Sequence, residues 1–267
     1  MSETKSLAPL PGEAGGQHIL AALVDHGETY GPQVVDRFVS ALPPIQLAVD
    51  LGAGHGRDLQ IIARAHPGAR TVAVEGSHQY ARQLAQTVDE VHTLDIERSR
   101  LPFPNEGVDL FVANQVLEHT KEIFWIFHEV TRALRIGGHF LVGVPNVASF
   151  HNRMLLLFGI HPTQHKLCSA HVRPFSKHDT LKFVGACFPG GFALAKFGGS
   201  QFYPLPRRFS RMVCAAFPTA AFSIFFLFRK LRRYDGEFAT YPVRAKLETN
   251  FWTGDLATES PYSAPQP

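Results

Sequence analysis

Cysteine is scarce in this sequence, and its spacing excludes two classes of cross-linked protein. The 267 residues include three cysteines, Cys168, Cys187 and Cys214, and none of them belongs to a Cys-x-x-Cys pair. The pattern therefore matches neither the disulfide framework of a small secreted protein nor the paired cysteines of a zinc site. Isolated thiols are typical of a reducing compartment, so we expect a cytoplasmic protein.

Dense positive charge is nearly absent as well. The formal net charge is +3, and lysine and arginine crowd together in one short stretch, residues 229–233. A nucleic-acid-binding protein usually presents a contiguous basic face. Nucleic acid is therefore not an expected partner.

A single long apolar run, residues 212–228, calls for a membrane check. Its length is close to the lower limit for a transmembrane helix, but Pro218 interrupts it and arginines flank both ends. We expect a short helix, a turn at residues 217–218 and a buried strand over residues 221–228. A peripheral contact with lipid is the alternative use of this stretch.

The most informative pattern lies in residues 47–56, which read Leu-Ala-Val-Asp-Leu-Gly-Ala-Gly-His-Gly. The apolar half predicts a strand covered on both faces. Gly52, Gly54 and Gly56 then allow a sharp turn or the close approach of a ligand, and a helix is expected from Arg57. A strand, a glycine turn and a helix N-terminus form the ligand-binding geometry of open α/β folds.

The spacing of these glycines excludes two common ligands. A dinucleotide fingerprint requires Gly or Ala at position 57, where Arg57 stands, and no Lys-Ser/Thr pair follows the turn as in a phosphate-binding loop. Asp50, at the end of the strand, would repel a pyrophosphate but can hold an ammonium group directly or through water. The pattern Asp-x-Gly-x-Gly-x-Gly resembles motif I of the class I S-adenosylmethionine (SAM)-dependent methyltransferases.

Two further regions agree with this resemblance. Glu75 ends the next predicted strand about 20 residues after the glycine turn, where a carboxylate can accept hydrogen bonds from ribose hydroxyls. Residues 101–119 are similar to the family's "LPF…D…VLEH" region. The resemblance implies that Asp95 binds the adenine amino group, that Ile96 packs on the ring and that Asn114 or Gln115 contacts the methionine part. The full predicted cofactor-binding set is Asp50, Gly52, Ala53, Gly54, Gly56, Glu75, Gly76, Asp95, Ile96, Asn114 and Gln115.

The family resemblance also predicts the architecture. We expect an α/β fold, a doubly wound and mostly parallel seven-stranded sheet of Rossmann-like methyltransferase type, with an antiparallel last strand. A helix after Thr120 is expected to end at Gly137-Gly138, and another is expected over residues 176–187. Residues 1–16 are expected to be a flexible lead-in without a signal-peptide pattern, residues 17–254 one domain with an insertion near 147–174, and residues 255–267 a flexible tail.

Three histidines are candidates for catalysis. Methyl transfer from a sulfonium is an in-line displacement, and it needs a base only if the acceptor arrives protonated. Imidazole titrates near neutral pH, and the candidates in order are His119, His171 and His151. His171 lies in His-Val-Arg-Pro-Phe-Ser, which is similar to a segment of methyltransferases acting on sugars, lipids and quinone-like acceptors.

Other polar groups receive plainer interpretations. Glu118 is expected to be a structural acid at a helix start. No metal is expected, because Pro162 disfavours the helix that would bring His161 and His165 together.

The expected reaction is methylation of a small molecule, with SAM as cofactor and S-adenosylhomocysteine (SAH) as product. The 22 phenylalanines favour an apolar, sugar-, lipid- or phenol-like acceptor. Residues 114–117 read Asn-Gln-Val-Leu and not Asn-Pro-Pro-Tyr/Phe, which favours transfer to oxygen over nitrogen and leaves carbon open. The alternatives are a non-catalytic SAM- or SAH-binding module serving a partner enzyme and an RNA methyltransferase. The sequence makes no prediction of the oligomeric state.

Overall fold

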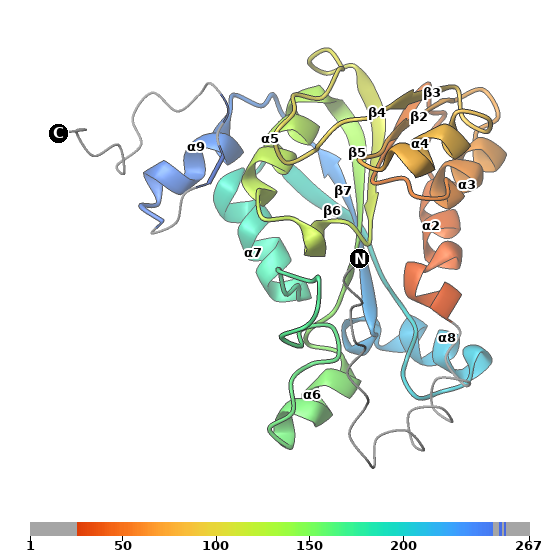
Figure 1. Ribbon diagram of the computed structural model, residues 1–267, viewed down its shortest axis with the longest axis vertical. Helices are drawn as coiled ribbons and strands as arrows, with labels where there is room; N and C mark the ends of the chain where they lie inside the picture. Colours follow the sequence, from red (N-terminus) through yellow and green to blue (C-terminus); the bar gives the residue numbers. More distant parts are fainter. Residues whose placement is uncertain (1–25, 248–250, 253, 255–267) are drawn as a thin grey trace, which may run out of the picture.

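The computed structural model describes residues 26–247, 251, 252 and 254, and in it a single sheet is covered by helices on both faces (Figure 1). The predicted lead-in and tail lie outside the described residues. The seven strands are β1 (Leu47–Leu51), β2 (Arg70–Val74), β3 (Glu90–His92), β4 (Val108–Asn114), β5 (Leu134–Pro145), β6 (Phe192–Ser200) and β7 (Ser223–Lys230).

The strand order is β3-β2-β1-β4-β5-β7-β6. Neighbours from β3 to β5 pair in parallel, whereas β7 runs antiparallel to both β5 and β6. This confirms the predicted doubly wound, mostly parallel sheet with an antiparallel last strand.

The helices separate into two layers and one exposed end. They are η1 (His26–Tyr30), α2 (Pro32–Val39), α3 (Arg57–Ala65), α4 (His78–Leu84), η2 (Leu117–His119), α5 (Ile123–Ala133), α6 (Phe150–Leu157), α7 (Lys177–Cys187), α8 (Arg207–Ala216), η3 (Pro218–Ala220) and α9 (Glu237–Arg244). Helices α2, α3 and α4 cover one face and α5, α7 and α9 the other, while α6 and α8 lie at one end of the sheet (Figure 1).

The alternation of side chains along β1 explains how both faces acquire a core. Val49 and Leu51 belong to the cluster shared with α5 and α7, and Ala48 belongs to the cluster shared with α2 and α3. Successive residues of a strand point to opposite faces, so a continuous apolar run is required in a central strand. The predicted strands at 47–51 and 108–114 and the helix start at Arg57 are confirmed.

The predicted helix stop at Gly137-Gly138 is wrong. Helix α5 ends at Ala133, and both glycines lie inside β5. At Gly138 an added Cβ would lie 3.0 Å from the carbonyl oxygen of Asp109. The glycine is therefore required by the close approach of β5 to β4 and does not end the helix.

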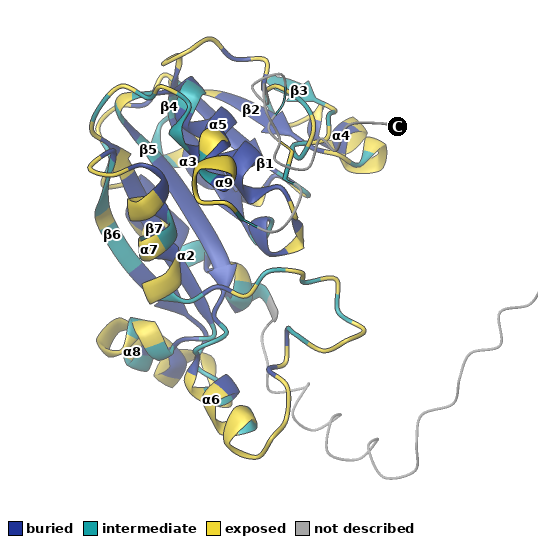
Figure 2. Ribbon diagram, turned by 90° about the vertical axis from the view of Figure 1, so that its left-hand side faces the viewer, coloured by how far each residue is buried: buried dark blue, intermediate teal, exposed yellow. Residues whose placement is uncertain are grey.

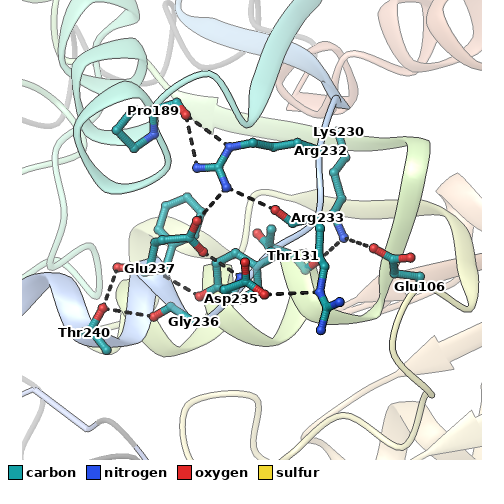
Figure 3. Close-up of polar contacts among 12 residues, drawn as sticks. Glu106, Thr131, Pro189, Lys230, Arg232, Arg233, Asp235, Gly236, Glu237 and Thr240 are labelled. Carbon is teal, nitrogen blue, oxygen red and sulfur yellow. Dashed lines mark hydrogen bonds and ion pairs between the residues drawn. The ribbon is translucent and has the colours of Figure 1, made fainter.

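A buried lysine satisfies the carbonyl groups at the end of α5. The side chain of Lys230 is 1% exposed, and its Nζ donates to the carbonyl of Thr131 (2.9 Å) and pairs with Glu106 (3.4 Å) (Figure 3). It also donates to the carbonyl of Leu134 (2.7 Å). The last carbonyls of a helix have no partner within the helix, and here an ammonium group from β7 supplies one. Burial lowers the pKa of Lys230, and Glu106 opposes the shift.

The apolar run at 212–228 forms the predicted helix, turn and strand. Helix α8 ends at Ala216, η3 contains Pro218, and β7 is buried between β5 and β6. Within the described residues, no helix combines the length and apolar character that crossing a bilayer requires.

Candidate active site

A cavity of about 320 Å³ opens at the carboxyl ends of β1 and β4. In open α/β sheets, ligands bind at this edge, where the direction of the strand order reverses. Members of the predicted cofactor set that line the cavity are Asp50, Gly52, Ala53, Gly54, Asn114 and Gln115. The lining also includes residues that sequence reasoning missed, namely Tyr30, His55, Arg57, Asp58 and Tyr80.

The three glycines of the turn all have positive φ angles, and they serve different purposes. Their φ values are +66° at Gly52, +52° at Gly54 and +71° at Gly56. A Cβ at Gly52 would lie 2.6 Å from Val116 Cγ2, and one at Gly56 would lie 2.8 Å from Leu84 Cδ2. At Gly54 the nearest atom would be 4.0 Å away. The outer glycines are thus required by packing, whereas the middle one leaves open space at the cavity.

Glu75 holds the glycine turn against the end of β2. Its Oε2 accepts from the backbone N–H of Gly54 and its Oε1 from that of Ser77, both at 2.8 Å. Each carboxylate oxygen keeps a second lone pair, so these bonds leave acceptors for ribose hydroxyls, and that role stays a prediction. Gly76 is next to Glu75, and a Cβ there would meet only the carbonyl of Leu94, at 3.9 Å.

Two buried carboxylates give the cavity its electrostatic character. Burial raises the pKa of Asp50 well above its usual range, and repulsion from Asp58 and Glu75 raises it further. Burial also raises the pKa of Asp58, and a hydrogen bond from Asn114 opposes that shift. A cationic ligand would relieve this repulsion, as the ammonium and sulfonium groups of SAM can.

Polar atoms without partners at this cavity match the amino-acid part of SAM. Among the described residues, Asp58 Oδ1, Asn114 Oδ1 and Gln115 Nε2 are buried and have no hydrogen-bond partner. The two acceptor oxygens suit the ammonium group of the amino-acid part, and the amide donor suits its carboxylate. Asn114 Nδ2 is fixed by Asp58 Oδ2 (2.8 Å) and the carbonyl of Tyr30 (2.9 Å). The residues present therefore fit the cofactor.

Gln115 carries backbone strain at the end of β4. Its φ is +59°, a region that non-glycine residues rarely adopt, and its N–H donates to the carbonyl of Gly143 at 2.8 Å. Strain of this kind persists where surrounding structure imposes it, often at functional sites.

The predicted adenine contacts lie outside the residues that line the cavity. Strand β3 ends at His92, and Asp95 is exposed with its Oδ1 accepting from the N–H of Glu97 at 2.8 Å. Ile96 is half-buried against the core. Both follow β3, and their adenine role stays a prediction. Gly56, Glu75 and Gly76 are likewise not among the residues that line the cavity.

The structure brings the first two catalytic candidates together. The rings of His119 and His171 meet edge to face with centroids 4.6 Å apart. The backbone N–H groups of Val172 and Arg173 donate to the carbonyl of Glu118 and hold this segment beside η2. His151 makes its contacts elsewhere, with Thr163 Oγ1 at 3.0 Å and with the ring of Tyr203.

Glu118 turns out to belong to this histidine pair. It is 1% exposed, its Oε2 has no partner among the described residues, and burial raises its pKa to about 8. One ligand-type atom from each of Glu118, His119 and His171 lies within 4.8 Å of the other two. Such a group can share a proton or hold a cation, and the absence of a metal stays a prediction. Burial lowers the pKa of His171, as do His119 and His165.

Fold and site together define a class of protein. The mixed seven-stranded sheet, the glycine turn after β1 and the acids Asp50 in β1 and Glu75 after β2 are the features predicted from the resemblance to class I methyltransferases. Residues 49–142 match the family model described as "Methyltransferase domain". These residues thus carry a methyltransferase domain, which is consistent with the predicted SAM-dependent class.

More specific similarities are partial. The chain is 31% identical over 97 residues to trans-aconitate 2-methyltransferase of an Azoarcus species, an alignment that covers 36% of this chain and 38% of the relative. The alignments span just over a third (37% and 38%) of the two curated relatives that are matched.

Solved structures share the fold at low identity. A chain of the Haloferax volcanii complex between the methyltransferase activator Trm112 and a methyltransferase aligns with a TM-score of 0.56 at 15% identity, covering 81% of this chain and 95% of that one. A SAM-dependent methyltransferase of Archaeoglobus fulgidus aligns with a TM-score of 0.53 at 15% identity, covering 76% and 94%.

Proposed function

We propose that the protein transfers the methyl group of SAM to an oxygen atom of a small, apolar or amphipathic acceptor. The observation that carries this proposal is the cluster of Glu118, His119 and His171, of which Glu118 and His119 follow Gln115 of the cofactor cavity by a few residues. A module that only bound SAM would have no need of a buried, unpartnered carboxylate beside two imidazole rings.

The residues of the cofactor cavity would bind and orient SAM. SAM supplies an electrophilic methyl group on its sulfonium. Asp50 and Asp58 would hold the cationic amino-acid part of the cofactor, and Gln115 would donate to its carboxylate. Such a fixed cofactor would present the methyl group to the acceptor in one direction, as in-line transfer requires.

His119 is the proposed base. Its Nδ1 lies 3.3 Å from the carbonyl of Ala170. When Nδ1 carries the proton and donates it to that carbonyl, the Nε2 lone pair is left to accept the hydroxyl proton of the acceptor. Glu118 Oε1 lies 3.9 Å from Nε2. Because burial raises the pKa of Glu118 to about 8, its carboxylate would stabilise the imidazolium at alkaline pH.

An apolar cavity beside this cluster supports the acceptor class. It measures about 310 Å³ and includes Val172, the neighbour of His171, together with Phe124, Phe175 and Phe183. Arg173 and Asp179 are among its polar lining groups. The name of the Azoarcus relative supports a small molecule as the acceptor, although trans-aconitate is an anionic carboxylic acid and not an apolar compound.

The proposal is tested first by calorimetric titration with SAM and SAH, followed by labelled-methyl transfer to a panel of phenols, sugars and lipid alcohols. With the acceptor found, H119A should lower turnover by about 100-fold while leaving SAM affinity unchanged, because a general base contributes about that much. H178A, which removes an exposed histidine of α7, is the matched control and should keep full turnover.

Three results would overturn parts of the proposal. Full activity of H119A would remove the base assignment. Activity lost on chelation and restored by a divalent metal would show that the cluster holds a cation. SAM binding without transfer to any acceptor would favour the binding module, and transfer to RNA would favour the RNA methyltransferase.

A further inference from the structure

Exposed apolar side chains are concentrated in two segments, and most of these side chains have no role in the proposed chemistry. Of the eighteen large hydrophobic side chains that are exposed in the described part of the chain, twelve lie in residues 147–175 and 201–222. They are Phe150, Met154, Leu156, Leu157, Phe158, Ile160, Leu167, Val172, Leu205, Phe209, Met212 and Phe217. Val172 belongs to the apolar cavity described above, and we call the surface on α6, α8 and their flanking loops that the other eleven residues form the α6–α8 face.

The two segments lie at the same end of the molecule. Helix α6 follows the carboxyl end of β5 and α8 follows that of β6, and both ends pair with Ser223 of β7. The rings of Phe150 and Phe202 stack with centroids 5.7 Å apart and join the segments. Both helices project beyond the sheet and carry mostly exposed residues (Figures 1 and 2). Because β5 is parallel to β4, this is also the edge that holds the cofactor cavity.

The charge of these segments has one sign. Residues 147–175 and 201–222 contain six lysines and arginines and no aspartate or glutamate. Glu28 of η1 faces them and pairs with Arg207 and Arg211, which offsets part of the charge. Arg153, Lys166 and Arg208 are exposed.

Helix α8 has the form of a helix that lies in an interface. Phe209 and Met212, one turn apart, are 62% and 69% exposed, whereas Ser210 and Cys214 face the protein. Helices with an apolar face and flanking arginines bind at the headgroup boundary, where apolar burial and attraction to anionic lipid add.

We propose that the α6–α8 face docks on an anionic lipid surface. A second copy of the chain is a poorer occupant, because it would bring two cationic surfaces together. RNA would match the charge but would leave the apolar side chains without a partner. Docking is peripheral, and it holds whether or not the chain methylates a small molecule.

The test is cosedimentation of the full chain with phosphatidylcholine vesicles, with and without phosphatidylglycerol. Binding should require phosphatidylglycerol and weaken as salt is added. L157E/F158E and F209E/M212E should each lower the fraction bound by about tenfold or more, because each pair loses apolar burial and adds repulsion. The matched control is I136E/L231E, which alters two side chains that are 46% and 47% exposed beside the opposite ends of the strands, and it should bind like the unaltered chain.

Three results would overturn the proposal. The unaltered chain could fail to bind vesicles at any phosphatidylglycerol content, or both α6–α8 variants could bind as well as the control. Sedimentation velocity could also show a dimer that only these variants lose, which would assign the face to self-association. SAM titration of the same variants separates this failure from that of the proposed function, since cofactor binding should persist in all of them.

Discussion

The carboxyl edge of the sheet has two parts that are built in different ways. The cofactor part, at the ends of β1, β2 and β4, is buried and polar, and its glycine turn is fixed by a carboxylate, Glu75. The part proposed for the acceptor, residues 147–175 and 201–222, places the two short α-helices α6 and α8 and many exposed apolar side chains at the same edge. A cofactor of constant shape is bound well by a rigid backbone. An acceptor or a lipid surface can be bound by side chains on adaptable segments.

The largest expected effect breaks the cofactor part and leaves the acceptor part intact. G54D places a side chain in open space at the cavity and a further negative charge near Asp50 and Asp58. SAM affinity should fall by about 100-fold or more, close to 3 kcal/mol, as measured by calorimetry. G190D is the matched control, because Gly190 also has a positive φ, +66°, with no atom within 4 Å of an added Cβ. Equal SAM affinity in G54D and G190D would contradict the motif assignment.

A smaller effect concerns the charge of the cofactor part. D50N removes the buried carboxylate that the proposal assigns to the ammonium group of SAM, and SAM affinity should fall by about tenfold. The raised pKa of Asp50 fixes the sign of the pH dependence. Below that pKa the carboxyl is protonated and neutral, so SAM binding should weaken as the pH falls. This weakening should begin at a higher pH than it would for an ordinary aspartate. Calorimetry across pH should show this loss in the unaltered chain and a flatter profile in D50N; identical profiles would assign the titration to another group.

The smallest effect is confined to the acceptor part. Ser149 caps α6, because its Oγ accepts from the N–H of Asn152 at 3.2 Å. S149A should cost about 1 kcal/mol of local stability, visible as faster hydrogen exchange in residues 150–157. SAM affinity should not change, and a parallel loss of affinity would show that the two parts are not independent. S176A, which removes the corresponding cap of α7, shows whether the faster exchange is specific to α6.

Sequence patterns predicted the cofactor part well because its determinants are local. The strand at 47–51, the glycines and the helix start at Arg57 lie within one short segment, and their order alone specifies the turn. Asp58 was missed, although its place in the first turn of α3 is a detectable signal for an acid near the cavity. The sequence suggested that residues 30–42 could lie over the cofactor cleft, but it did not single out Tyr30, whose carbonyl reaches Asn114 only through the tertiary fold.

The acceptor part and the helix end were predicted less well because distant residues determine them. The end of α5 depends on Lys230, 99 residues after Thr131, and no local pattern near Gly137 contains that information. Glu118 was interpreted as a structural acid. Its place beside His171 depends on the backbone bonds that Val172 and Arg173 donate to it, and these bonds join segments far apart in the sequence.

The strand order has a consequence for the way this chain is made. Among the described strands, β7 is the last to leave the ribosome, yet it inserts between β5 and β6. Until residue 230 has been synthesised, β5 has an unpaired edge with Phe140 and Val142, and the carbonyls of Thr131 and Leu134 lack the ammonium group that they bind. Unpaired apolar edges recruit other chains. A nascent chain that pauses before β7 is therefore exposed to aggregation, and completion of the sheet is a late, non-local folding step.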